Sequence, residues 1–233
     1  MIHMALDGLR VIAAIPCFNT EKHIGDVVER TKKYVDKVIV INDGSHDETT
    51  RAALDAGATV ISHEENKGYG EAINSCLKAA REEKPDILVI VDGDGQHNAD
   101  EIPRLLAPIV NDGADIVIGS RFLDGLNMPE YRRFGIGVIT YLWNFGSKTK
   151  VTDSQSGFRA YTKDAYEKLS VSEQGMSASI EILEQARRAK LKIKEVPITC
   201  IYTRSFITRG AVKHGLGVAL AVLKIRAHRN VGE

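Results

Sequence analysis

Residues 86–97 read Asp-Ile-Leu-Val-Ile-Val-Asp-Gly-Asp-Gly-Gln-His, so an apolar run ends abruptly in two carboxylates one residue apart. The apolar half is typical of a central strand buried on both faces of a sheet. Ligands of open α/β sheets bind at the carboxyl ends of the strands. Alternate residues of an extended segment point the same way, so Asp92, Asp94 and Gln96 are predicted to line one side of a pocket.

The chemistry of these three side chains suits a small divalent ion. Two carboxylate oxygens and an amide oxygen are hard ligands of the kind that Mg²⁺ and Mn²⁺ prefer. The alternative is an ordinary acidic turn after a strand. An Asp-x-Asp pattern is common, so the motif alone leaves both interpretations open.

Outward from this stretch, strand and helix patterns alternate along the first half of the chain. Short apolar runs at residues 11–15, 37–41, 58–62 and 115–118 are separated by segments with helical spacing. This order predicts an α/β fold with a mostly parallel, doubly wound central sheet flanked by helices. The second half is less regular: it reads as a loop at 123–133, a helix at 134–148, a polar turn with a short strand at 153–159 and a helix at 177–189. An extended segment follows at 193–201, where Pro197 indicates an edge strand.

Composition limits the functional classes. The chain has 233 residues and a formal net charge of +0, which gives no general attraction for nucleic acid. Its three cysteines are far apart in sequence, and any single disulfide would leave one of them over. Reduced thiols, as in a cytoplasmic protein, are therefore expected. No secretory signal is evident, and no apolar stretch approaches the roughly 20 residues that a membrane-spanning helix needs.

Several familiar nucleotide-binding and hydrolytic motifs are missing. The first strand is followed by Pro16-Cys17-Phe18-Asn19, where a dinucleotide-binding protein would carry Gly-x-Gly-x-x-Gly. The chain contains neither a Walker A sequence nor a Gly-x-Ser-x-Gly elbow. NAD binding, P-loop chemistry and serine hydrolysis are therefore disfavoured.

Six motifs that occur in a fixed order fit one family together. They are Ile15-Pro16-Cys17-Phe18-Asn19-Thr20-Glu21, Asn42-Asp43-Gly44-Ser45-His46-Asp47-Glu48-Thr49, Asn66-Lys67-Gly68-Tyr69-Gly70, Asp92-Gly93-Asp94-Gly95-Gln96-His97, Gly119-Ser120-Arg121 and Asp153-Ser154-Gln155-Ser156-Gly157-Phe158-Arg159. Over residues 10–205 the chain resembles the family 2 glycosyltransferases of GT-A fold. Within them it is most similar to the polyprenyl (dolichyl) phosphate mannose and glucose synthases.

The resemblance implies a donor side that binds a GDP- or UDP-linked sugar. Asp43 would accept a hydrogen bond from the base, although a turn residue that caps the next helix is the alternative. Phe18 and Asn42 depart from the Tyr and Asp that are usual in the family. The residues implied in nucleotide binding are Pro16, Phe18, Asp43, Gly68, Gly70 and Asp92. Asp92, Asp94 and Gln96 would hold Mg²⁺ or Mn²⁺, which stabilises the departing diphosphate.

The resemblance also implies an acceptor side. Arg121, one of Arg132 and Arg133, and Arg204 would bind phosphate groups, for which the planar guanidinium is well suited. Asp153 would orient a sugar hydroxyl or an arginine, because an acceptor phosphate is already a nucleophilic anion. Asp94, Arg121 and Asp153 are the candidate catalytic residues.

The predicted organisation is a catalytic domain at residues 1–205, with a donor half at 10–121 and an acceptor half at 122–205. A basic amphipathic helix without a membrane span is predicted at 206–233. The predicted function is inverting transfer of a hexose to a polyprenyl phosphate by a cytoplasmic enzyme on the cytosolic membrane face, with homo-oligomers possible. The alternatives are a GT-A enzyme with a hydroxyl acceptor, for which Asp153 or Glu181 would be the base, and an inactive nucleotide-sugar-binding scaffold. A sugar nucleotidyltransferase is disfavoured because its glycine-rich loop is missing.

Overall fold

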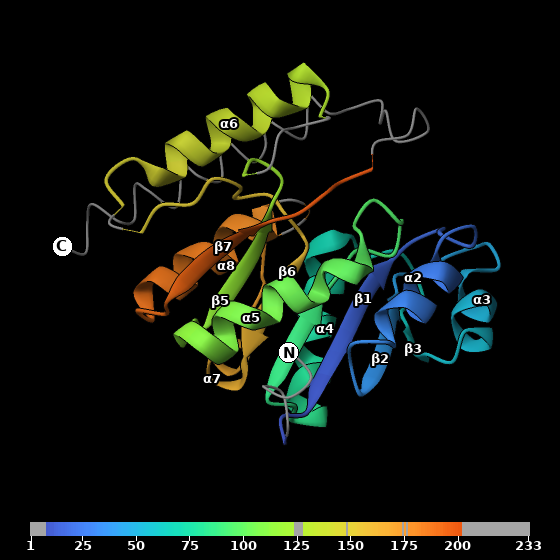
Figure 1. Cartoon of the computed structure of the whole chain (residues 1–233). Helices are drawn as coiled ribbons and strands as arrows, with labels where there is room; N and C mark the ends of the chain where they lie inside the picture. The colour runs from blue at the N-terminus through green and yellow to red at the C-terminus, as the bar shows by residue number, and fades with distance from the viewer. Residues whose placement is uncertain (1–7, 124–127, 148, 174, 176, 202–233) are drawn as a thin grey trace.

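The computed structural model describes residues 8–123, 128–147, 149–173, 175 and 177–201, and they form a three-layer α/β fold (Figure 1). Its seven-stranded sheet has the order β3-β2-β1-β4-β6-β5-β7. The predicted α/β class with a mostly parallel sheet and flanking helices is confirmed. The strands are β1 (Val11–Cys17), β2 (Lys37–Asn42), β3 (Thr59–Ser62), β4 (Ile87–Ile90), β5 (Ile116–Ser120), β6 (Arg159–Thr162) and β7 (Ile193–Pro197).

The sheet departs from the doubly wound parallel pattern at β5. This strand does not pair with β4, because β6 enters between them and runs antiparallel to both. Val89 and Val117 both lie opposite Ala160 in the two registers. The alternating pattern of the first half contains no sign of this insertion, because the inserted strand comes from the second half of the chain.

Two helical layers cover the sheet, and each closes one apolar core. The first core joins side chains such as Ile12 and Ile90 to α4, α7, α8 and the inner side of α6. The second joins Ala13 and Val89 to α2, α3 and α5. The helices are α2 (Ile24–Thr31), α3 (Thr49–Asp55), α4 (Tyr69–Glu83), α5 (Ile102–Asp112, after the 3₁₀ turn Ala99–Glu101), α6 (Glu130–Asn144), α7 (Lys163–Lys168) and α8 (Ser177–Arg188).

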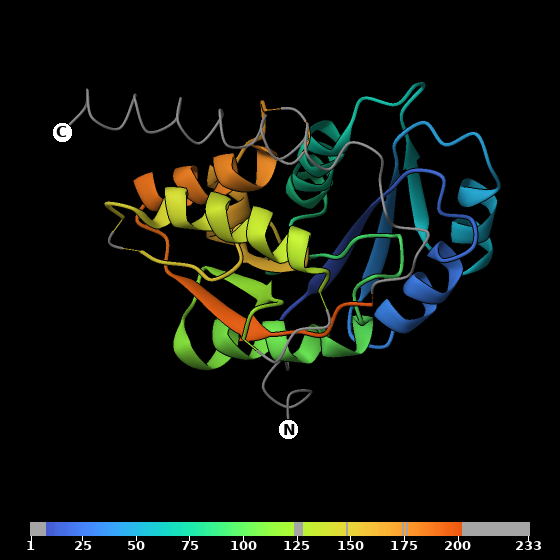
Figure 2. The ribbon, with the colours of Figure 1, turned by 90° about the horizontal axis from the view of Figure 1, so that it is seen from above.

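Helix α6 begins four residues earlier than the sequence pattern predicts. Arg132 and Arg133 therefore lie in its first turn, where their amides donate to the Pro129 carbonyl, and their predicted place in a loop is wrong. The helix ends before Gly146, whose φ of +72° suits a glycine. Figure 1 shows α6 across one end of the body, above β5 and β7, and the view from above places it alongside α8 (Figure 2).

Strand β7 lies at the edge of the sheet and ends at Pro197, as predicted for a strand that contains proline. The chain then crosses toward the acidic motif: Cys200 forms an isolated bridge with His97, and the Ile201 amide donates to the Gln96 carbonyl at 2.8 Å. Arg204 and the helix predicted at 206–233 lie outside the described residues. Among the helices that are described, none is long and apolar enough to cross a bilayer.

Candidate active site

The acidic motif leaves the carboxyl end of β4 and turns around a tightly packed glycine. The Gly93 amide donates to the Pro16 carbonyl at 3.1 Å, and a Cβ at this position would lie only 2.8 Å from the Cys17 Cβ. The side chain of the preceding residue, Asp92, is largely buried. Its Oδ2 lies 3.5 Å from His97 Nδ1, whereas its Oδ1 is buried without a hydrogen-bond partner among the described residues.

Asp94 and Gln96 form a local turn. The Gln96 amide donates to Asp94 Oδ1 at 2.9 Å, and the Gln96 side-chain amide donates to Asp94 Oδ2. Burial, followed by the negative charge of Asp94, raises the pKa of Asp92 to about 7. Burial also lowers the pKa of His97 to about 4, and its ring stacks on Phe158 at a centroid distance of 5.4 Å. The motif thus places two carboxyl groups, of which Asp92 is shifted toward its neutral form, beside a buried, uncharged imidazole.

These residues fit a divalent ion as a partial ligand shell. The buried, unpartnered Oδ1 of Asp92 is an orphaned acceptor, which costs free energy unless it meets a cation or a donor. The described residues contain no group of three or more His, Cys, Asp or Glu side chains that would hold a metal by themselves. Mg²⁺ is commonly held by one or two carboxylates together with phosphate oxygens and waters, so the donor set suits an ion that arrives with a diphosphate.

The polar turn before β6 packs directly against this motif. A Cβ at Gly157 would lie 2.5 Å from Asp92 Oδ2 and 2.8 Å from the Tyr69 hydroxyl, so a larger residue there would displace the Asp92 carboxylate. The buried Arg159 donates to the carbonyls of Ser154 and Ser156, and its positive charge counteracts the rise in the pKa of Asp92. Tyr69, Gly157 and Arg159 were not predicted as site residues, although the motifs that contain them were recognised.

The acceptor-side candidates Arg121 and Asp153 form a bidentate pair. Arg121 Nε donates to Asp153 Oδ2 at 2.7 Å and its Nη2 donates to Oδ1 at 2.8 Å. The Asp153 side chain is fully buried, and its amide donates to Glu195 on β7 at 3.0 Å. Burial alone would raise the pKa of Asp153, but the charge and hydrogen bonds of Arg121 bring it below the usual value. Asp153 therefore holds an arginine and lacks the raised pKa of a general base.

Arg121 connects this pair electrostatically to the acidic motif, because its positive charge opposes the rise in the pKa of Asp92. Arg132 and Arg133 lie on α6, which is tied to the same turn by a 2.8 Å hydrogen bond between Thr140 and Ser154. Their phosphate-binding role stays a prediction.

On the donor side, Asp43 is engaged by protein donors. Its carboxylate accepts from the amides of Lys67 and Gly68 at 2.9 and 2.8 Å, and it lies 2.6 Å from His63 Nδ1. The other ring nitrogen of His63 lies 2.8 Å from the Ser75 hydroxyl. Asp43 thus anchors the glycine loop that opens α4, where Gly68 has a φ of +89°. A hydrogen bond from a nucleotide base to Asp43 stays a prediction. It would use the lone pairs of the carboxylate oxygens that these contacts leave over.

The other predicted donor-side residues surround this loop. Pro16 lies at the end of β1, where it accepts from the acidic motif, and Gly70 is buried in the first turn of α4. Phe18 is 42% exposed and meets His46 edge-on at a centroid distance of 6.4 Å. Their nucleotide contacts also stay predictions.

We expect His63→Ala to lower the free energy of unfolding by about 1–3 kcal/mol, because the buried Asp43 and the half-buried Ser75 each lose a hydrogen-bond partner. His46→Ala is the matched control at an exposed position, with an expected change within about 0.5 kcal/mol. Urea denaturation of both variants measures the difference. Equal stability of the two variants would show that His63 does not hold the loop anchor.

Comparison with known proteins gives a consistent result. The family model described as glycosyl transferase family 2 matches residues 12–170. A Methanococcus voltae protein named UDP-N-acetylglucosamine–dolichyl-phosphate N-acetylglucosaminyltransferase is 35% identical over 219 residues, covering 84% of this chain and 87% of its own length. A Haloferax volcanii protein named dolichyl-phosphate hexose transferase is 32% identical over 202 residues, covering 85% of each chain.

The solved structures support the fold. Glucosyl-3-phosphoglycerate synthase from Mycobacterium tuberculosis, crystallised with Mn²⁺, UDP-glucose and phosphoglyceric acid, matches 96% of this chain and 82% of its own with a TM-score of 0.76. Its sequence identity is 21%, so this likeness concerns the architecture alone. Since the family model covers more than half of the chain, and its motifs lie together at the carboxyl ends of the strands, the chain belongs to the family 2 glycosyltransferases.

Proposed function

We propose that this protein transfers a hexose from a nucleoside diphosphate sugar to a polyprenyl or dolichyl phosphate, with inversion at the anomeric carbon. The observation that carries the proposal is Arg121, fixed by the buried Asp153 close to the acidic motif. A rigid guanidinium suits a phosphate acceptor, because it presents planar donors and adds positive charge. The names of the Methanococcus and Haloferax relatives support the same substrate class.

The chain's own residues would mainly position the reactants. Arg121 would hold the acceptor phosphate so that one oxygen faces the anomeric carbon, opposite the diphosphate. The new carbon–oxygen bond forms as the bond to the diphosphate breaks, and the bonding electrons leave with the diphosphate. No proton has to be removed from the nucleophile. Asp92, Asp94 and Gln96 would hold Mg²⁺ or Mn²⁺, which when bound stabilises charge on the diphosphate.

A hydroxyl acceptor would require a general base, and both candidate bases already bind other groups of the protein. Asp153 is paired with Arg121. Glu181 accepts hydrogen bonds from the amides of Ser172 and Glu173, each at 2.8 Å, and so holds a loop. These contacts favour a phosphate acceptor. We further propose that the enzyme works at the cytosolic face of a membrane, where a polyprenyl phosphate would be found.

An assay with purified protein, Mg²⁺ or Mn²⁺, a short polyprenyl phosphate in detergent and a panel of UDP- and GDP-linked sugars tests the function. We expect one donor to give a lipid-linked hexose, identified by mass, and chelation by EDTA to stop its formation. The absence of lipid-linked product with every donor would refute the proposal.

A further inference from the structure

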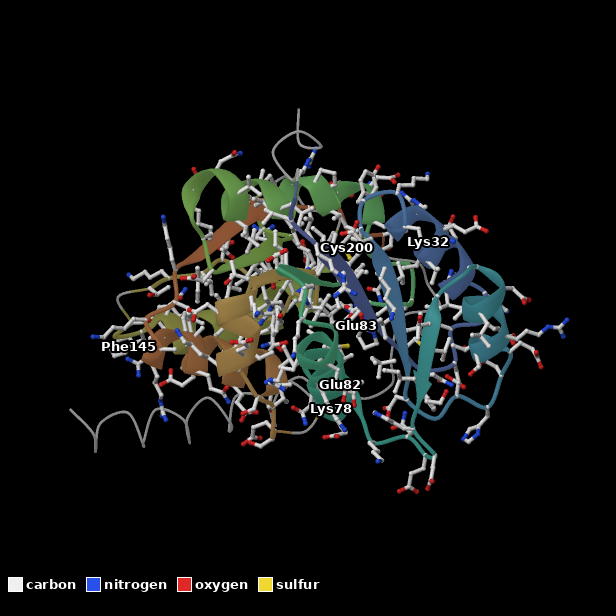
Figure 3. All side chains as sticks on the ribbon, turned by 90° about the horizontal axis from the view of Figure 1, so that it is seen from below. Lys32, Lys78, Glu82, Glu83, Phe145 and Cys200 are labelled. Carbon is white, nitrogen blue, oxygen red and sulfur yellow. The ribbon has the colours of Figure 1, made fainter. Side chains whose placement is uncertain are left out.

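Helix α6 and its C-cap residue Phe145 expose a continuous row of large apolar side chains, which we call the aromatic stripe. It consists of Tyr131, Phe134, Val138, Tyr141 and Phe145, which are 51, 75, 40, 66 and 57% exposed. Their spacing alternates between three and four residues, which places all five on one side of the helix. Figure 3 shows Phe145 at the outer margin of the molecule.

The opposite side of α6 is fixed to the protein. Ile139 and Trp143 are buried in the core, and the Thr140 hydroxyl bonds to Ser154. Asn144 donates to the Val151 carbonyl at 2.7 Å and accepts from its amide at 3.0 Å. These bonds join α6 to the turn that carries Asp153, so the helix cannot rotate to bury its stripe without breaking the acceptor side of the site.

The composition of the stripe fits a lipid surface. Tyrosine rings are favoured at the boundary between water and hydrocarbon, and phenylalanine is common on the apolar face of interfacial helices. Arg133 near one end of the helix and Lys150 after the other end are exposed cations, and such residues attract anionic headgroups. A helix of this kind lies in the interface with its apolar side toward the acyl chains.

A second copy of the chain is a less suitable partner for the aromatic stripe than a membrane. Aromatic side chains bury about 150–250 Å² each, so the partly exposed stripe offers on the order of 500 Å². A stable protein interface needs about 800 Å² from each partner. The stripe alone therefore suits a membrane better than a dimer.

We propose that the aromatic stripe of α6 docks the protein on an anionic membrane surface. The inference rests on the proposed function, because a lipid-linked acceptor requires the site to meet a membrane. Docking through the stripe would set the turn of Asp153, and with it Arg121, beside the headgroup layer. The phosphate of an embedded acceptor would then reach Arg121 while its polyprenyl chain stays in the bilayer.

Flotation of the full-length protein with vesicles tests the inference without any substrate. The vesicles contain phosphatidylcholine with about 30% phosphatidylglycerol, or phosphatidylcholine alone. We expect the double variant Phe134→Ser/Tyr141→Ser to bind the anionic vesicles at least about tenfold more weakly than the parent protein. The matched control is Leu54→Ser on α3, where Leu54 is 53% exposed, and it should bind like the parent.

Activity gives the second measurement. With a short acceptor in detergent, the double variant should retain turnover within about twofold, whereas with an acceptor embedded in vesicles it should lose about tenfold. Equal flotation of the parent and the double variant, or no binding of the parent to either vesicle, would overturn the inference. A stripe-dependent dimer in light scattering without vesicle binding would overturn it too. Product formation in detergent would still stand in each of these cases, so the proposed function is judged separately.

Discussion

Asp94→Asn should reduce turnover at saturating donor and Mg²⁺ by about a thousandfold, because a metal that acts as a Lewis acid contributes several kcal/mol to the transition state. The substitution keeps the shape of the side chain and an oxygen that can accept from the Gln96 amide. It removes the negative charge that a divalent cation requires. We therefore expect the midpoint of urea unfolding to stay close to that of the parent protein.

Steady-state kinetics and Mn²⁺ binding, followed by electron paramagnetic resonance, check this expectation. Asp55→Asn is the control, since Asp55 lies at the surface of α3 with its side chain 75% exposed. It should change neither turnover nor Mn²⁺ affinity. Full activity and unchanged Mn²⁺ binding in Asp94→Asn would remove Asp94 from the proposed metal site.

A double-mutant cycle on Arg121 and Asp153 should give the second large effect. Arg121→Met leaves a fully buried carboxylate without its cation, and breaking one partner of a buried pair costs about 3–5 kcal/mol of folding free energy. Asp153→Asn should reduce turnover because Arg121 loses its fixed orientation. If Asp153 acts only through Arg121, adding Asp153→Asn to Arg121→Met should change turnover within about twofold.

Independent losses that multiply in the double variant would instead identify Asp153 as a base in its own right. The pH dependence of stability gives a further control. Because the pKa of Asp153 is below its usual value, the pair stabilises the fold above the unfolded pKa of about 3.9. This contribution is lost as the pH falls through the lower folded pKa. The stability difference between Asp153→Asn and the parent should therefore be constant above about pH 5 and shrink in stronger acid.

Much of the fold could be predicted from local patterns. The strand predicted at 87–91 is found as β4 at 87–90, because an apolar run rich in β-branched residues suits a buried strand, and the acidic residues follow its carboxyl end. The position of β6 could not be predicted this way. Its pairing with both β4 and β5 depends on contacts between residues distant in sequence, which no local periodicity encodes.

In the candidate site, too, the residues could be predicted from the sequence motifs, whereas their contacts with one another could not. Arg121 and Asp153 were predicted as separate candidates from their motifs, while their direct pairing emerges only in three dimensions. Asp43 was expected to face a base, and the structure adds its anchoring of the Lys67–Gly68 amides. Gly157 could be recognised as a turn glycine, but its close approach to Asp92 results from packing between two distant loops.

The place of β6 between β4 and β5 also has a consequence for how the chain matures during synthesis. When the ribosome has released residues only through β5, the strand that must separate β4 from β5 has not yet been made, since it begins at Arg159. Until then the nascent protein presents the unpaired edge of β4, which is the kind of surface that promotes aggregation. Completion of the candidate active site therefore coincides with closure of this edge, because Gly157 and Arg159, which lie against the acidic motif, belong to the same late segment as β6.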